Sequence, residues 1–298
     1  MQRYLIAAIA ALACVSCSQA AGDTTPEPRP TPTPKAIVDS DTSSDWRIVP
    51  AEDLLVIKTR FGDIFVELNA EFAPGHVKRI RDLAAKRALN GAEFYRVIDG
   101  FVAQGGLQAE SDWTPLENEN ERPFTASDAF TPLGNADLFA SEIGFAHGFP
   151  VARNPETGMQ WLTHCPGAMA MARDTDPNSG LTEFYIVLDA QRYLDRNLTV
   201  FGRVIKGMDI VQKLTRGDKD VAGGVIQPPT KPDKMFSFLM ASDISEAERP
   251  ILEVMKTDSS AFARALDGQR IRKDPFFYNT PPEVVDLCDA DIPVRQIK

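Results

Sequence analysis

Histidine and cysteine are scarce in this chain of 298 residues, which has three histidines and four cysteines. The sequence also lacks a GxSxG motif, an HExxH motif and a phosphate-binding glycine loop. These absences argue against serine hydrolases, zinc peptidases and nucleotide-binding enzymes. His76, His147 and His164 have no metal-ligand spacing, so we expect them on the surface or in loops. Neither a metal nor a cofactor is expected.

Positive charge is also limited, with 32 Lys and Arg against 42 Asp and Glu and a net charge of −10. Nucleic acids and anionic membrane surfaces are bound by clustered Lys and Arg, so neither is expected as the main partner. The composition, 43% hydrophobic and 25% charged, is that of a globular protein. The length suffices for one large domain or two modest ones.

The first 20 residues have the pattern of a signal peptide. Arg3 supplies a positive charge, and residues 5–13 form an apolar run that is too short to span a bilayer as a helix. Two processing routes are open: Ser18-Gln19-Ala20 resembles an ordinary cleavage site, and Cys14 or Cys17 could be lipidated. We therefore expect an exported, periplasmic protein, either soluble or lipid-anchored.

Residues 21–50 are rich in Pro and Thr and poor in residues that could form a core, so we expect an extended linker there. Cys165 and Cys288 are the only cysteines beyond the signal. In an oxidising compartment they could form a disulfide, and two buried thiols are the equal alternative.

Alternating apolar residues predict a mainly β fold, an antiparallel barrel with helices at its ends. Residues 108–166 read as a long irregular insertion with short strands only around 139–145 and 161–163. From residue 244 to 298 two helical patterns and an extended tail predict an appendage that packs on the barrel. The expected strands are 54–58, 64–68, a strand at Phe94, 168–173, 184–188, 199–204 and 235–241, and the expected helices run from Pro74 to about Asn90 and over 208–214.

The segment FYRVIDGFVAQGG, from Phe94 to Gly106, is the most informative in the chain. Its alternation predicts that Phe94, Arg96 and Ile98 lie on one face of a strand. An arginine beside a large apolar ring suits a substrate held on an apolar surface while one permanently charged donor acts on it.

Three segments together resemble the cyclophilin family of peptidyl-prolyl cis-trans isomerases in order, content and spacing. They are FYRVIDGFVAQGG, AMARDTDPNSGLTEFYIVL, which ends at Leu188, and YLDRNLTVFGRVIKGMDIV, from Tyr193 to Val211. The resemblance covers residues 51–243, with the insertion interrupting it. It implies an eight-stranded antiparallel barrel capped by two helices, with a substrate groove on its outer face.

The resemblance also implies an activity, the acceleration of X-Pro bond rotation in unfolded or partly folded exported proteins, performed by a monomer. Arg96 matches the family's catalytic arginine, which acts without a covalent step. The substrate-binding positions that the resemblance implies are Phe101, Val102, Gln104, Ala172, Arg173, Glu183, Tyr185, Tyr193, Leu194 and Leu198.

Three of these positions depart from the family pattern. Glu183 stands where glutamine is usual, Tyr193 where many members have tryptophan, and Leu198 where many have histidine. A carboxylate at 183 has no donor hydrogens and could pair with Arg96 or Arg173. The alternative function is therefore a proline-peptide binding module or a periplasmic chaperone with weak or no isomerase activity.

Overall fold

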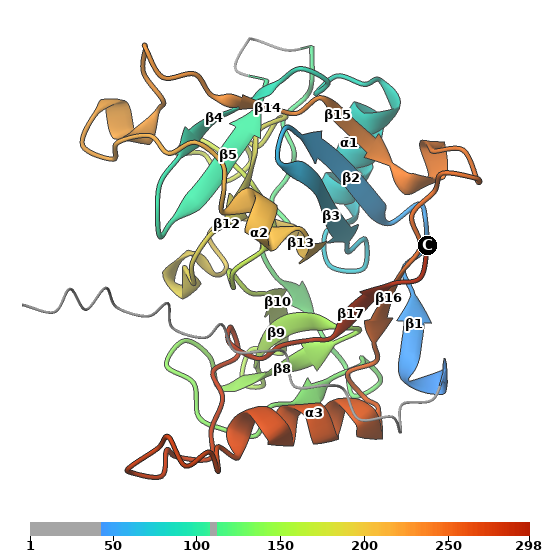
Figure 1. The fold of residues 1–298 in the computed structure, drawn as a ribbon, viewed down its shortest axis with the longest axis vertical. Coiled ribbons are helices and arrows are strands. Elements are labelled where there is room, and N and C mark those ends of the chain that lie inside the picture. The colour runs from blue at the N-terminus through green and yellow to red at the C-terminus, as the bar shows by residue number, and fades with distance from the viewer. Residues whose placement is uncertain (1–42, 108–111) are drawn as a thin grey trace, which may run out of the picture. The chain divides into compact units, whose positions relative to one another are not determined.

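The computed structural model of the chain describes residues 43–107 and 112–298 (Figure 1). The predicted signal peptide and most of the predicted linker lie outside the described residues. Within the described residues, no helix is both long enough and apolar enough to cross a bilayer.

The main sheet of the described residues has nine antiparallel strands in the order β14-β4-β5-β12-β11-β13-β3-β2-β15 (Figure 1). β14 and β15 are two parts of one segment, which pairs with β4 through Asp233 and with β2 through Leu239. Eight segments therefore close into a barrel, and the predicted eight-stranded antiparallel fold is confirmed. The strands are β2 (Leu54–Thr59), β3 (Gly62–Leu68), β4 (Glu93–Val97), β5 (Val102–Gly106), β11 (Ala168–Met171), β12 (Phe184–Val187), β13 (Val200–Lys206), β14 (Asp233–Lys234) and β15 (Ser237–Met240).

The closing segment is held by a buried carboxylate. Asp233 has a side chain that is 2% exposed, pairs with Arg60 at 2.5 Å and accepts a hydrogen bond from the backbone N–H of Thr215 at 2.7 Å. A buried charge is stable only when it is paired and hydrogen-bonded, and both conditions are met here.

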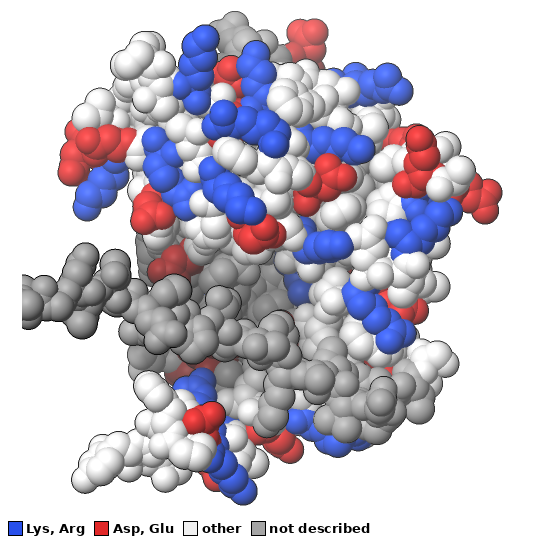
Figure 2. Space-filling model, in the orientation of Figure 1, with Lys and Arg blue, Asp and Glu red and all other residues white. Residues whose placement is uncertain are grey.

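On the face shown in Figure 2, Lys and Arg side chains are interspersed with Asp and Glu.

Two helices pack against the barrel, α1 (Pro74–Ala85) and α2 (Met208–Val211). Pro74 suits the first turn of α1 because its missing N–H would have no partner there. Val77, Ile80 and Leu83 are fully buried in the core, which matches the predicted apolar stripe. The helix ends before the predicted Asn90 because Arg87 adopts a left-handed φ of 51°.

The insertion is not the irregular loop that the sequence predicted. It forms a five-stranded antiparallel sheet in the order β6-β10-β9-β8-β7 (Figure 1). His147 and Gly148, both with positive φ, make the two-residue turn between β8 and β9. Arg153 and Gln160 are buried and hydrogen-bonded to each other at 3.0 Å, so the strands lack the apolar alternation that reveals a sheet. The strands are β6 (Arg122–Pro123), β7 (Thr131–Pro132), β8 (Glu142–Ala146), β9 (Phe149–Asn154) and β10 (Met159–Leu162).

A third sheet joins both ends of the described chain in the order β1-β16-β17. β1 (Trp46–Ile48) falls inside the predicted linker 21–50, so ordered structure begins before residue 50. β16 (Leu252–Met255) replaces the first helix predicted after residue 244, and the second is present as α3 (Ser260–Arg270). β17 (Val294–Gln296) completes the sheet.

A second hydrophobic core joins the barrel to the insertion and the C-terminal segment. It contains Leu54 and Phe65 of the barrel, Phe145 of the insertion and Phe262 of α3, with the last two rings packed edge to face at 5.2 Å. Cys165 and Cys288 form a disulfide with their Cα atoms 4.8 Å apart. Of the two alternatives left by the sequence, the structure shows the disulfide.

Candidate active site

Three side chains form a row on the outer face of the barrel. Arg96 on β4 is paired with Gln104 on β5, and Gln104 is also the partner of Tyr185 on β12. Side chains directly opposite each other on neighbouring strands lie on the same face of a sheet. The register alone therefore places Arg96, Gln104 and Tyr185 side by side.

Phe94 does not share a face with Arg96, contrary to the sequence prediction. Phe94 is fully buried in the barrel, where its ring packs edge to face on Phe184. Glu93 pairs with Gly106 whereas Arg96 pairs with Gln104, so β4 has one extra residue between two points of the ladder. Such a bulge shifts the alternation by one position. It leaves both Tyr95 and Arg96 in contact with the Gln104 side chain.

The Arg96 guanidinium is held on two of its nitrogens. Nε donates to the carbonyl oxygen of Gly223 at 2.8 Å, and Nη1 donates to Oε1 of Gln104 at 3.1 Å. The guanidinium carbon lies 5.6 Å from the centre of the Phe101 ring. Within the described residues, Nη2 has no hydrogen-bond partner, so Arg96 presents a fixed donor.

The loop that holds Arg96 comes from residues 217–226, which sequence reasoning did not assign to the site. Gly217 N–H donates to the carbonyl of Val97 at 2.7 Å, and Ile226 N–H donates to that of Tyr95 at 2.9 Å. Gly224 has a φ of +89°, and a Cβ on it would lie 2.4 Å from Cγ1 of Ile98. The sequence pair Gly223-Gly224 was the available signal for this close approach.

A cavity of about 210 Å³ opens beside Arg96. Nine of the eleven predicted site residues line it, and they come from three strands (β4, β5 and β12), the 3-10 helix Arg192–Leu194 and three connecting segments. Tyr193 does not line the cavity, and its side chain is 62% exposed. The lining residues are Arg96, Phe101, Val102, Gln104, Ala172, Arg173, Tyr185, Leu194 and Leu198.

Glu183 lies behind Gln104 and contacts neither arginine. Its Oε2 accepts hydrogen bonds from the Tyr95 hydroxyl at 2.8 Å and from Nε2 of Gln104 at 3.3 Å. Burial, together with the hydrogen bond to Glu183, raises the pKa of Tyr95, which therefore stays a donor. The hypothesis that Glu183 pairs with Arg96 or Arg173 is wrong for the described residues, which contain no such ion pair. Instead Glu183 orients the Gln104 amide so that its oxygen faces Arg96.

Arg173 is occupied elsewhere on the rim of the cavity. Its Nη2 donates to the carbonyl of Asn197 at 2.7 Å, and its Nη1 donates to that of Asp174 at 2.7 Å. These bonds join the connection after β11 to the connection before β13. Arg173 thus shapes the rim and leaves Arg96 as the cation beside Phe101.

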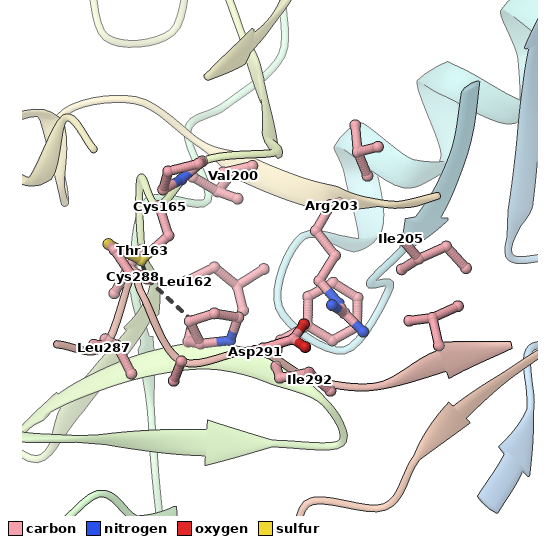
Figure 3. A pocket seen from close by; sticks show the side chains of 18 residues that line it. Leu162, Thr163, Cys165, Val200, Arg203, Ile205, Leu287, Cys288, Asp291 and Ile292 are labelled. Carbon is pink, nitrogen blue, oxygen red and sulfur yellow. Dashed lines mark hydrogen bonds between the residues drawn. A yellow bond between two sulfur atoms is a disulfide. The ribbon is translucent and has the colours of Figure 1, made fainter. Parts of the chain in front are cut away.

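A second cavity of about 180 Å³ lies between the barrel, the insertion and the C-terminal segment (Figure 3). Most of the residues that line it are apolar, and the Cys165–Cys288 disulfide is among them. Burial lowers the pKa of Arg203 to about 10, and Nε and Nη2 of this residue are covered by protein without a hydrogen-bond partner. Nη2 of Arg203 lies 3.6 Å from Oε2 of Glu67, so this guanidinium is paired with a carboxylate, whereas Arg96 has no such ion pair in the described residues. The described residues contain no group of three His, Cys, Asp or Glu side chains that could hold a metal ion.

The fold and the site together define a class of protein: a closed antiparallel barrel with an external apolar pocket next to a fixed guanidinium. The family model for cyclophilin type peptidyl-prolyl cis-trans isomerases matches residues 54–238, more than half of the chain. The chain belongs to this family, whose homologues are named peptidyl-prolyl cis-trans isomerases.

Similar proteins agree with this assignment. A probable peptidyl-prolyl cis-trans isomerase of Brucella suis is 30% identical over 192 residues, which cover 64% of this chain and 84% of the relative. A peptidyl-prolyl cis-trans isomerase of Acinetobacter baylyi is 27% identical, covering 64% of this chain and 87% of the relative. The crystal structure of cyclophilin AquaCyp293 from Hirschia baltica matches with a TM-score of 0.70 at 32% identity, covering 84% of this chain and 93% of that one.

Proposed function

We propose that this protein accelerates rotation about X-Pro bonds in exported proteins, by non-covalent catalysis at Arg96 beside a hydrophobic proline pocket. One observation carries the proposal. The Arg96 guanidinium is fixed on Nε and Nη1 and has a further nitrogen, Nη2, without a partner in the described residues, next to an apolar cavity.

The chemistry requires only positioning and one donor. An X-Pro bond has a rotation barrier of about 18–20 kcal/mol because of its partial double-bond character, and isomerises in roughly tens to hundreds of seconds. At the twisted transition state conjugation is lost and the imide nitrogen gains a lone pair. A donor that is already in place stabilises that lone pair more than it stabilises the planar ground state, which lowers the barrier.

The residues have complementary parts in this mechanism. The proline ring enters the cavity among Phe101, Leu194 and Leu198, with Tyr185 as its wall. Gln104 holds Nη1 of Arg96, which leaves Nη2 to donate to the imide. The step uses a donated hydrogen bond and transfers no proton, so it needs no tuned acid or base.

The proposed substrates are unfolded or partly folded exported proteins with accessible X-Pro bonds. Two observations support the export part of the proposal: the signal-peptide pattern of residues 1–20 and the disulfide between Cys165 and Cys288. Disulfides persist in oxidising compartments such as the bacterial periplasm.

The intact mass of the protein purified separately from the soluble and membrane fractions tests export and distinguishes the two processing routes. Cleavage after Ala20 predicts an unmodified mature chain. Lipidation predicts a heavier, membrane-bound chain that begins at Cys14 or Cys17. An unprocessed cytosolic chain would contradict the export proposal.

A refolding assay limited by proline isomerisation tests the activity. Wild type is expected to accelerate the slow phase, and Arg96→Ala to remove most of the gain while its unfolding curve stays unchanged. Binding of a proline peptide by both proteins, without acceleration by either, would select the alternative of a binding module or chaperone.

A further inference from the structure

We infer that His164, a residue of the insertion, is a positioning residue for the proline pocket. It anchors the hydroxyl of Tyr185 and so fixes the ring of Tyr185 as the wall against which the proline packs. The inference rests on the proposed function, which it deepens by adding a determinant of substrate affinity that lies outside the barrel strands.

The geometry around His164 is that of a buried relay of hydrogen bonds. The side chain of His164 is 0% exposed, although the sequence predicted a surface or loop histidine. Its Nε2 lies 2.9 Å from the Tyr185 hydroxyl, and the two rings stack with their centres 6.1 Å apart. On the other side of the imidazole, Nδ1 lies 3.1 Å from Oδ1 of Asp195, and the same oxygen accepts from the backbone N–H of His164 at 2.8 Å.

A second layer of charged side chains holds Asp195 in place. Nε of Arg192 donates to Oδ2 of Asp195 at 2.6 Å, and its two terminal nitrogens donate to the carboxylate of Asp137 at 3.2 and 3.3 Å. The side chains of Arg192, Asp195 and Asp137 are each at most 6% exposed. Buried polar networks specify a single arrangement when every member is paired, and this one runs from Asp137 to the wall of the pocket.

The direction of the hydrogen bonds follows from Asp195, which can only accept. In a neutral imidazole Nδ1 therefore carries the proton, and Nε2 accepts from the hydroxyl of Tyr185. Burial raises the pKa of Tyr185, so this hydroxyl remains a donor. Its hydrogen is turned away from the cavity, and the pocket presents the apolar ring of Tyr185 to the substrate.

The same network also reaches Leu194. This residue ends the short 3-10 helix Arg192–Leu194, whose first residue, Arg192, belongs to the network, and it lines the same cavity as Tyr185. Without His164, the hydroxyl of Tyr185 would lack a partner in a buried site. An unpaired buried hydroxyl is costly, so the ring would turn to find water or a backbone acceptor and narrow the pocket.

Steady-state kinetics with a proline peptide test the inference, using wild type, His164→Ala, Tyr185→Phe and the double variant. His164→Ala is expected to raise KM by about 10-fold with kcat changed by less than about 2-fold, because the wall contacts the proline ring equally in ground and transition states. Tyr185→Phe is also expected to raise KM, and the double variant should be no worse than His164→Ala, since both act through one hydrogen bond.

His76→Ala is the matched control. His76 is also a buried histidine paired with a carboxylate, since its Nδ1 lies 2.7 Å from Glu119, but it does not line the pocket. It should lower stability and leave KM unchanged. Equal KM effects of His76→Ala and His164→Ala, or additive effects of His164→Ala and Tyr185→Phe, would overturn the inference.

Two further outcomes are separable. If His164→Ala fails to fold, Tyr185→Phe alone decides, because an unchanged KM in that conservative variant contradicts an anchoring role for the hydroxyl. If wild type shows no isomerase activity, the proposed function fails. The dissociation constant of the proline peptide, measured on the same variants, then still tests whether His164 positions the ring of Tyr185.

Discussion

The two sides of the proline pocket are built by different parts of the chain. The side with Arg96 uses barrel strands β4 and β5 and the loop around Gly223, and its guanidinium keeps a nitrogen unpaired in the described residues. The other side, formed by Tyr185, lies on barrel strand β12, and its hydroxyl is anchored by His164 of the insertion. The Cys165–Cys288 disulfide lies one residue away and joins the insertion to the C-terminal segment.

This difference separates two tasks of the site. Arg96, the donor to the rotating bond, is half-buried, and its Nη2 has no hydrogen-bond partner in the part of the chain that the structure describes. A wall that only has to keep its shape is backed by a fully buried network. Stability and substrate affinity should therefore depend in part on segments outside the barrel, while the rate of the bond rotation should depend on Arg96, its strands and the loop around Gly223.

Breaking the disulfide is expected to have the largest effect on stability. The double variant Cys165→Ser/Cys288→Ser opens a link between positions 123 residues apart, and loss of such a link typically costs about 2–5 kcal/mol of unfolding free energy. Urea denaturation of the variant, with reduced wild type as the control, measures this loss. An unchanged midpoint would show that the apolar contacts around Phe262 suffice without the disulfide.

A smaller loss of stability is expected when the cap that the insertion provides for α1 is removed. Ala73, at the start of the helix, provides no side-chain cap, and Glu119 instead accepts from the backbone N–H groups of Gly75 at 2.9 Å and His76 at 3.0 Å. Burial alone would raise the pKa of Glu119, but its hydrogen bonds with His76 and Gly75 outweigh burial and hold the pKa below its ordinary value of 4.5. The ionised carboxylate therefore stabilises the fold above about pH 4.5, and the contribution is lost as the pH falls.

Glu119→Gln should accordingly lower the unfolding free energy by about 1 kcal/mol at pH 7 and by less at pH 3. Glu117→Gln, a change at a neighbouring exposed position, serves as the control and should behave as wild type at both pH values. Thermal unfolding across this pH range gives the comparison. If Glu119→Gln lost the same amount of unfolding free energy at pH 3 and pH 7, the charged form of Glu119 would be ruled out as the cap.

Among these variants, Glu183→Gln is expected to have the smallest effect, a small change in kcat/KM. The Tyr95 hydroxyl can donate to an amide oxygen as it does to the carboxylate, and Arg96 does not contact position 183. We therefore expect kcat/KM to change by less than about 3-fold, corresponding to roughly 0.6 kcal/mol. An increase of about 10-fold or more would mean that the carboxylate restrains Arg96 after all.

The barrel and most pocket residues could be predicted because each lies in a short segment with a recognisable order of residues. Arg96, Gln104 and Tyr185 belong to such segments, and the register of three strands brings them together. The prediction from alternating residues was wrong at Phe94, because a bulge is a property of a pair of strands and cannot be seen in the sequence of one strand.

The supporting residues could not be predicted in the same way. His164 stands in a segment without apolar alternation, and its partners Asp195 and Tyr185 are 31 and 21 positions away. Nothing in the spacing of these residues distinguishes a buried relay from separate surface groups. The sheet of the insertion was missed for a similar reason, because the buried pair Arg153 and Gln160 reads as solvent-exposed.

The most direct test of the account compares wild type, Arg96→Ala and Arg96→Lys in the proline-limited refolding assay, with urea denaturation of all three. The account predicts that Arg96→Ala loses about 10²- to 10³-fold in kcat/KM at unchanged stability, and that Arg96→Lys, which keeps the charge but not the planar fork, is also strongly impaired. If a folded Arg96→Ala variant accelerated refolding as much as the wild-type protein does, the central claim that this guanidinium stabilises the twisted imide would be contradicted.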